Sequence, residues 1–192
     1  QQYLAINTLV HQAAMTETMT VDQLARAIRP CIGLTQRQAQ TTYKYHDALI
    51  QQGYTPEEAR RKQAIYAEKM HRRRAATIAS TELAYAHNAG ADAAIQHSID
   101  EGLIEPDLNK EWSTAEDERV CDICGKLNGI KVPRGDKFPG GIDLPPAHPN
   151  CRCAVLYTDL KVIAPKPQPA QPTSQSPAQV PDPDAPSIPE DI

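Results

Sequence analysis

The sequence predicts an α+β protein that is mostly helical. We expect an elongated helical part over residues 1–102, a small loop-rich β module over 103–163, and a disordered Pro-rich tail over 164–192. Only 5% of the 192 residues are aromatic and alanine is abundant before the tail, which favours closely packed helices over a large β-sandwich or barrel. Nine of the 17 prolines follow Ala164 among Gln, Ser, Ala and Asp, a composition that cannot bury a core.

Three short helices are expected at the start of the chain. Residues 3–14 are apolar enough for a helix. Thr20 precedes residues 21–28, whose apolar side chains recur at helical spacing. Thr35 is a candidate N-cap for a helix over residues 36–52, which closes at a glycine.

A fourth helical pattern is much longer. It begins at Pro56, with Thr55 as its N-cap, and continues to about Glu101. Unbroken, it would form a rod of about 68 Å. Either residues 88–90 (Asn-Ala-Gly) bend this rod, or the protein is elongated and leans on a partner. The alanines between residues 75 and 86 allow another helix backbone to approach closely.

The module that follows Leu103 is rich in proline and glycine, so loops and short strands are expected there and helix is not. Candidate strands cover residues 129–132 and 154–157. Trp112 is expected to form the small core, with Asp117 and Arg119 fixing a loop through hydrogen bonds.

Charge and hydropathy exclude some classes of protein. The net charge of −4 argues against a globally basic nucleic-acid binder. No run of about 18 apolar residues is present, so a membrane span is excluded. The chain opens at Gln1 rather than at Met, which indicates a fragment or a processed product.

Four cysteines and one histidine of the module are spaced like zinc ligands. Cys121 and Cys124 form a C-x-x-C pair, and His148, Cys151 and Cys153 form a second group. Two such groups can pin two loops that are too poor in apolar residues to pack alone. The best four ligands are Cys121, Cys124, Cys151 and Cys153. Because His148 competes for one of the last two places, five donors leave the assignment open.

Other interpretations of the cysteines are two disulfides or simple buried thiols. The lack of a secretion signal and the tight spacings favour zinc. Cys31 stands alone and is expected to be a buried thiol. A catalytic zinc would keep one position open for water beside a Glu or His base, whereas the acidic residues between 116 and 122 are typical of a solvated loop. A structural zinc ion is therefore predicted.

Arg72, Arg73 and Arg74 lie in the strongest basic cluster. The functional interpretation is contact with DNA phosphates or with an acidic protein face. The alternative is a solvated face, because three successive arginines point in three directions around a helix. For Glu82, a salt bridge to Arg74 within the helix packing is preferred to a catalytic role.

The module also resembles a known family. Residues 112–124, 127–129 and 145–153, together with Phe138, resemble the C-terminal signature of the phage Mu F-like head morphogenesis proteins, the minor head proteins of tailed phages. Upstream, short segments between Gly33 and Gly90 resemble the helical half of the same domain. The likeness covers roughly residues 30–157 and depends mainly on the HPNCRC motif that begins at His148.

The resemblance implies a structural, non-catalytic component of the phage head that acts near the portal during procapsid assembly and DNA packaging or delivery. Its expected partners are portal and major capsid proteins, with DNA contacts through Arg72, Arg73 and Arg74, and neither a membrane nor a small-molecule substrate is expected. The expected location is the virion, after synthesis in the host cytoplasm. The alternatives are a zinc-dependent hydrolase or nuclease and a DNA-binding adaptor.

Overall fold

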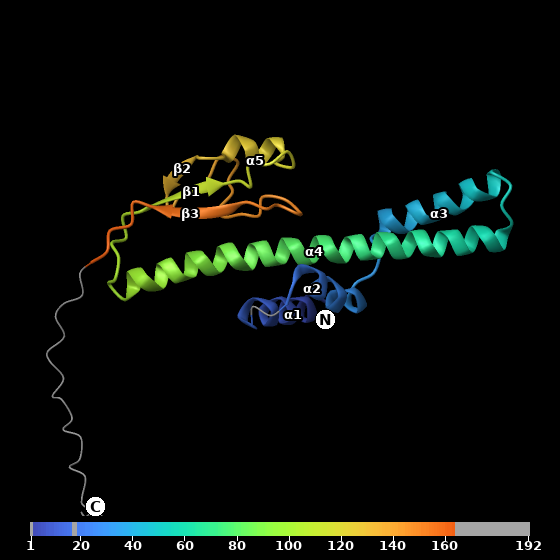
Figure 1. Cartoon of the computed structure of the whole chain (residues 1–192), viewed down its shortest axis with the longest axis horizontal. Helices are drawn as coiled ribbons and strands as arrows, with labels where there is room; N and C mark the ends of the chain where they lie inside the picture. Colours follow the sequence, from blue (N-terminus) through green and yellow to red (C-terminus); the bar gives the residue numbers. More distant parts are fainter. Residues whose placement is uncertain (1, 17–18, 164–192) are drawn as a thin grey trace, which may run out of the picture.

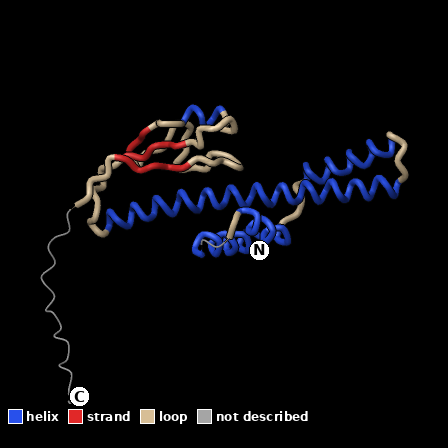
Figure 2. The backbone as a smooth tube through the Cα atoms, viewed as in Figure 1, coloured by secondary structure: helices blue, strands red, loops and turns tan. Residues whose placement is uncertain are grey.

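The computed structural model describes residues 2–16 and 19–163, so the tail predicted over 164–192 lies outside the described residues. The chain is mostly helical, with one three-stranded sheet (Figures 1 and 2). The elements are α1 (Gln2–Thr16), α2 (Val21–Ile28), the 3-10 turn η1 (Arg29–Cys31), α3 (Gln36–Gln51), α4 (Pro56–Asp100), β1 (Asn109–Ser113), α5 (Asp122–Leu127), β2 (Lys131–Pro133) and β3 (Ala154–Thr158).

Helix α4 is the axis of the molecule. The Thr55 side chain caps it by accepting a hydrogen bond from the Glu58 N–H, and Glu58 completes a capping box. The helix has 45 residues and runs through residues 88–90 without a break, which at 1.5 Å per residue gives about 68 Å. The molecule is therefore elongated, with α1 and α2 on one side of α4 and the β module along the other (Figure 1).

An apolar core joins α1 and α2 to the middle of α4. Ala75 and Ala79 on α4 are completely buried, and their short side chains let the smaller helices lie directly against the α4 backbone, as the alanine-rich stretch predicts. The buried residues of this core are Val10, Ala13, Leu24, Ala25, Ile28, Ile32, Ala75 and Ala79.

Helix α3 folds back along the first half of α4 and forms a hairpin with it (Figure 1). Thr35 caps α3 through a hydrogen bond from the Gln38 N–H to its side chain. The rings of Tyr45 and Tyr66 meet across the hairpin at 4.7 Å between centroids, and Leu49 is buried between the helices.

The module is a three-stranded antiparallel sheet of order β2-β1-β3. Strands β2 and β3 lie close to the two predicted segments, whereas the central strand β1 was not predicted. The expectation that no helix forms in this region was wrong, because α5 fits into the six residues after Cys121. Trp112, completely buried as expected, meets Phe138 edge-to-face at 5.2 Å.

The structure has two separate apolar cores. The second core lies inside the module and includes buried cysteines as well as Trp112 and Phe138. Neither core contains residues of the other, so α4 and the module meet mainly through polar contacts, which are described below. Among the described helices, none is long and apolar enough to cross a membrane.

Candidate metal centre

The C-x-x-C pair is held by the start of α5. Cys121 is the N-cap of this helix, and its sulfur accepts a hydrogen bond from the Cys124 backbone N–H at 3.5 Å. This bond is the largest reason why the pKa of Cys121 is lowered from its ordinary value. The N-cap position thus makes it easier for Cys121 to form a thiolate, which is the form that binds metals.

His148 begins the segment His148–Cys153, which we call the metal loop. Its Nε2 lies 3.1 Å from the Cys121 sulfur and 3.2 Å from the Cys124 sulfur. The other ring nitrogen, Nδ1, lies 2.9 Å from the Pro149 carbonyl oxygen. Because a carbonyl oxygen only accepts hydrogen bonds, Nδ1 carries the proton and, in the neutral ring, Nε2 keeps a lone pair for a metal.

Cys151 and Cys153 complete the cluster from the other end of the metal loop. Both are buried, and the Cys151 sulfur lies 3.7 Å from the Cys124 sulfur. Ligand atoms within 4.8 Å of one another form two groups that share Cys124. The groups are Cys121, Cys124 and His148, and Cys124, Cys151 and Cys153.

The donor set fits a metal ion. All five cysteines are free, so no disulfide consumes the sulfurs of this cluster. A tetrahedral zinc ion with Zn–S bonds of about 2.3 Å places two sulfurs about 3.8 Å apart, close to the 3.7 Å between Cys124 and Cys151. A cavity of about 20 Å³ opens among Cys121, Cys124, His148 and Cys153.

Without a metal ion, burial disfavours the thiolate form of the two inner cysteines, Cys124 and Cys153. It is the largest cause of the raised pKa of Cys124 and of Cys153. The Pro149 carbonyl, followed by neighbouring thiolates, raises the pKa of His148. A divalent cation at the centre would reverse this balance, because it stabilises thiolates and the neutral imidazole.

Asp117 ties the two halves of the centre together. Its carboxylate accepts hydrogen bonds from both terminal nitrogens of Arg152, one of them at 2.8 Å. It also accepts the Arg119 backbone N–H at 3.1 Å and the Arg119 guanidinium at 3.0 Å. The hydrogen bonds from Arg152 are the largest cause of the lowered pKa of Asp117. Asp117 and Arg119 therefore fix a loop, as predicted, and Arg152 is a third member of this contact.

The metal loop is fastened to α4 through Asn150, which has a left-handed backbone conformation with φ of 59°. The Asn150 backbone N–H donates to the Thr81 hydroxyl at 3.0 Å, and its side-chain oxygen accepts a hydrogen bond from Ser80 at 2.7 Å. Its amide nitrogen donates to the Thr77 hydroxyl at 3.3 Å. One residue of the HPNCRC motif thus serves docking rather than ligation.

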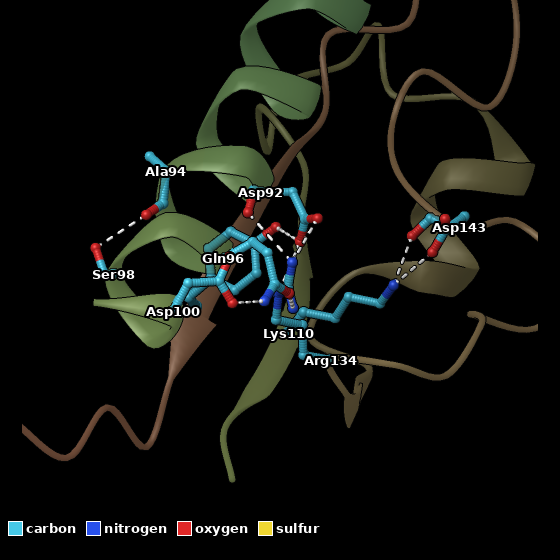
Figure 3. Close-up of polar contacts among 9 residues, drawn as sticks. Asp92, Ala94, Gln96, Ser98, Asp100, Lys110, Arg134 and Asp143 are labelled. Carbon is cyan, nitrogen blue, oxygen red and sulfur yellow. Dashed lines mark hydrogen bonds and ion pairs between the residues drawn. The ribbon is translucent and has the colours of Figure 1, made fainter. Parts of the chain in front are cut away.

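Three further polar residues of α4 continue this line toward its C-terminal end. Buried Asn88 bonds the backbone at the start of β3. Asp92 accepts hydrogen bonds from the Tyr157 hydroxyl at 2.6 Å and from Arg134 at 2.8 Å, and Gln96 accepts from Arg134 at 2.6 Å (Figure 3). Sequence reasoning missed these residues. The only signal in the sequence is that positions 77, 81, 88, 92 and 96 recur on one face of a helix.

Lys110 of β1 is a second buried polar residue that sequence reasoning missed. Its side chain is 1% exposed and points into the module. The ammonium group donates to the Asp143 carboxylate at 2.7 Å and to the Asp143 carbonyl at 3.0 Å (Figure 3). It also lies 5.5 Å from the centroid of the Phe138 ring.

Two predictions about single residues were wrong. Cys31 is only half-buried, because it ends η1 at the edge of the helical core, and it lies outside both groups of ligand atoms. Among the residues that the structure describes, no ion pair joins Glu82 to Arg74. Both side chains are half-buried and line the same notch on α4.

The three arginines do not form one surface. Arg72 donates to Glu68 at 3.0 Å, and Glu68 also pairs with Arg29. Arg73 is exposed, whereas Arg74 is half-buried. Arg72 is thus engaged with Glu68, whereas Arg73 and Arg74 line one notch, so the expectation that the three guanidinium groups point in three directions holds only for Arg72.

The fold and the cluster define a helical protein with a Cys/His-bearing module docked on its longest helix. The model of the family described as Phage Mu protein F like protein matches residues 5–156. The chain belongs to this family, which confirms the resemblance noted in the sequence and indicates a phage head morphogenesis protein. No curated protein and no solved structure matches the chain significantly.

Proposed function

We propose that this protein is a structural component of a phage head that acts at or near the portal, through contacts with portal and major capsid proteins. Family membership over residues 5–156 is the observation that supports this role. The elongated form supports this role too, because a molecule built on a helix of 45 residues offers a long surface for contacts with other subunits of the head. We expect the protein in the virion, at a copy number well below that of the major capsid protein.

Quantitative mass spectrometry of purified particles and procapsids tests this role. A head component is detected in both or in procapsids alone, and deleting its reading frame reduces the yield of filled heads. A protein that is absent from particles and procapsids, and whose deletion leaves head yield unchanged, is not a head component.

The proposal includes a structural zinc ion in the Cys/His cluster. Cys121, Cys124 and His148 are three of its ligands, because their donor atoms lie within 4.8 Å of one another. The fourth ligand is one of the two cysteines at the other end of the metal loop, Cys151 or Cys153. Cys151 has the sulfur spacing of a tetrahedral site, and Cys153 lines the cavity. Four ligands from two loops close the coordination shell, which is typical of structural rather than catalytic zinc.

Metal analysis of single variants tests the ligand set. The wild-type chain should bind one zinc ion per molecule, and Cys121→Ser and Cys124→Ser should lose it. Of Cys151→Ser and Cys153→Ser, the variant that loses zinc identifies the fourth ligand. Cys31→Ser is the matched control, because Cys31 lies outside the cluster. Full zinc content in the Cys121 and Cys124 variants would contradict the site.

DNA binding by Arg72, Arg73 and Arg74 is not part of this proposal. A phosphate-binding face needs several cations that point the same way. Here Arg72 is paired with Glu68, and Arg74 is half-buried in a notch. The geometry therefore favours contact with the carboxylates of a protein segment for the remaining arginines.

A further inference from the structure

A notch lined by three charged side chains opens on α4 between the start of α3 and the metal loop. Its volume of about 410 Å³ lies within the range of pockets that bind small ligands. Gln38 of α3 forms one wall, Pro149 of the metal loop forms another, and α4 forms the floor. The charged residues that line it are Arg73, Arg74 and Glu82.

Both arginines of the notch lack an acidic partner within the described ranges 2–16 and 19–163. The Nε of Arg74 is shielded from solvent and has no hydrogen-bond partner. Arg73 is exposed and forms no ion pair in this part of the chain. Two guanidinium side chains without an ion pair in this part of the chain therefore line one notch, and an anionic group that enters it can pair with them.

The floor of the notch is already ordered. The hydroxyl groups of Thr77 and Thr81, which also line it, are bonded to Asn150 of the metal loop. Their positions therefore depend on the docked module and not on an incoming ligand. Such preorganised surroundings reduce the entropy that binding costs.

The charges favour the carboxylates of a peptide over the phosphates of DNA. Two guanidinium groups and the single Glu82 carboxylate leave a net positive notch of limited size. One or two carboxylate side chains satisfy such a notch, and Arg binds carboxylates in bidentate geometry. A DNA strand brings a continuous row of negative charges past Glu82, which repels them.

We infer that the notch binds Asp182 and Asp184 of the chain's own acidic segment, residues 181–186 (Pro-Asp-Pro-Asp-Ala-Pro). Between residues 167 and 189, these two aspartates are the only charged residues. They match in number the two arginines that have no partner in the described chain. Because segment and notch belong to one chain, the effective concentration is on the order of millimolar, so modest affinity suffices.

The chain is long enough for this contact. Ile163 lies beside Leu103, just beyond the end of α4, where its N–H donates to the Leu103 carbonyl at 2.9 Å. From Leu103 back to Ile78, which lines the notch, α4 covers about 38 Å at 1.5 Å per residue. Residues 164–181 span up to about 56 Å at 3.1 Å per residue. Asp182 can therefore reach the notch with length to spare.

Side-chain NMR of the full-length chain tests the contact. The Arg74 Nε–H signal is assigned by its loss in Arg74→Lys and compared between the wild type and the Asp182→Asn, Asp184→Asn double variant. The double variant should shift this signal, and raised salt should move the wild-type signal in the same direction, because screening weakens the pair. The matched control is Glu190→Gln, Asp191→Asn, which removes equal charge beyond the segment and should leave the Arg74 signal in place.

Three outcomes would overturn the inference. One is an Arg74 signal that is identical in the wild type and the double variant. Another is a difference that grows with protein concentration, which would indicate contact between two copies. The third is an Arg74 signal that is unchanged by the aspartate substitutions but shifts when a short DNA duplex is added, which would identify a phosphate site instead.

Discussion

The Asn88 side-chain oxygen accepts a hydrogen bond from the Val155 backbone N–H at 2.8 Å, and both residues are buried. The Asn88 amide nitrogen donates to the Cys153 carbonyl at 3.3 Å. One side chain of α4 thus pairs with the outer edge of β3 as a neighbouring strand would, which protects an edge that could otherwise pair with another chain.

Asn88→Ala should detach the module from α4. It leaves the Val155 N–H and the Cys153 carbonyl without partners, at a cost of roughly 1–3 kcal/mol for each buried group. Urea unfolding followed by Trp112 fluorescence measures this loss. The control is the exposed neighbour His87, whose replacement by Ala should change the free energy of unfolding by less than about 0.5 kcal/mol. Equal stability of the two variants would argue against the docking role of Asn88.

Metal removal should affect the module and spare the helices. Trp112 is the only tryptophan of the chain and is completely buried in the module core, so its emission reports on the module alone. Chelation should shift this emission to longer wavelength, because the cysteine cluster packs against Trp112. Far-UV circular dichroism should keep most of its helical signal. Unchanged tryptophan emission after complete zinc removal would show that the metal is not structural.

Acid should weaken the contact between Asp92 and the module. Burial alone would raise the pKa of Asp92, but hydrogen bonds from Tyr157 and Arg134 outweigh it and lower the pKa below the ordinary value of 3.8. A carboxyl group with a lowered folded pKa stabilises the fold above its unfolded pKa, and this stabilisation is lost as pH falls through the folded pKa.

The effect of Asp92 should therefore appear below about pH 4. Asp92→Asn, compared with the wild type in urea titrations at several pH values, should show a smaller loss of stability in that range. The comparison between the two proteins removes the contribution of acid-induced metal release, which both share. Parallel stability curves down to pH 2 would mean that Asp92 makes no such contribution.

Two substitutions of Lys110 distinguish how much its packing and how much its charge contribute to the stability of the module. Lys110→Met keeps a long side chain in the module and lets the largely exposed Asp143 carboxylate return to water, so we expect a change within about 1 kcal/mol. Lys110→Ala leaves a cavity beside Phe138 and should cost about 2–4 kcal/mol. Chemical denaturation of both variants measures the difference. Equal losses would mean that the ion pair, not the packing, stabilises the module.

The helical part could be predicted from local signals. Thr20, Thr35 and Thr55 each occupy an N-cap with a capping box, and such signals act over a few residues. Whether residues 88–90 bend α4 could not be decided in this way. Asn88 is held by β3, about 65 residues later in the chain, so the answer depends on tertiary contacts that no local pattern encodes.

The module was harder to predict because its core is partly polar. In β1 the inward positions are Lys110 and Trp112, and a buried lysine hides the alternation that identifies a strand. The spacing of Cys121, Cys124 and the metal loop did predict that these donors come together, since ligand spacing is a local property. The docking role of Asn150 could not be predicted from the motif, because its partners lie on α4, about 70 residues earlier in the chain.

The unbroken helix α4 also fixes the distance between the two ends of the molecule. The hairpin with α3 covers the first half of this helix and the module covers the second half, with no joint between them (Figure 1). Seven residues added to an exposed stretch of α4 would lengthen it by about 10.5 Å and rotate its faces by only about 20°. The number of residues in this single helix therefore sets the distance between the partners that bind at the two ends of the molecule.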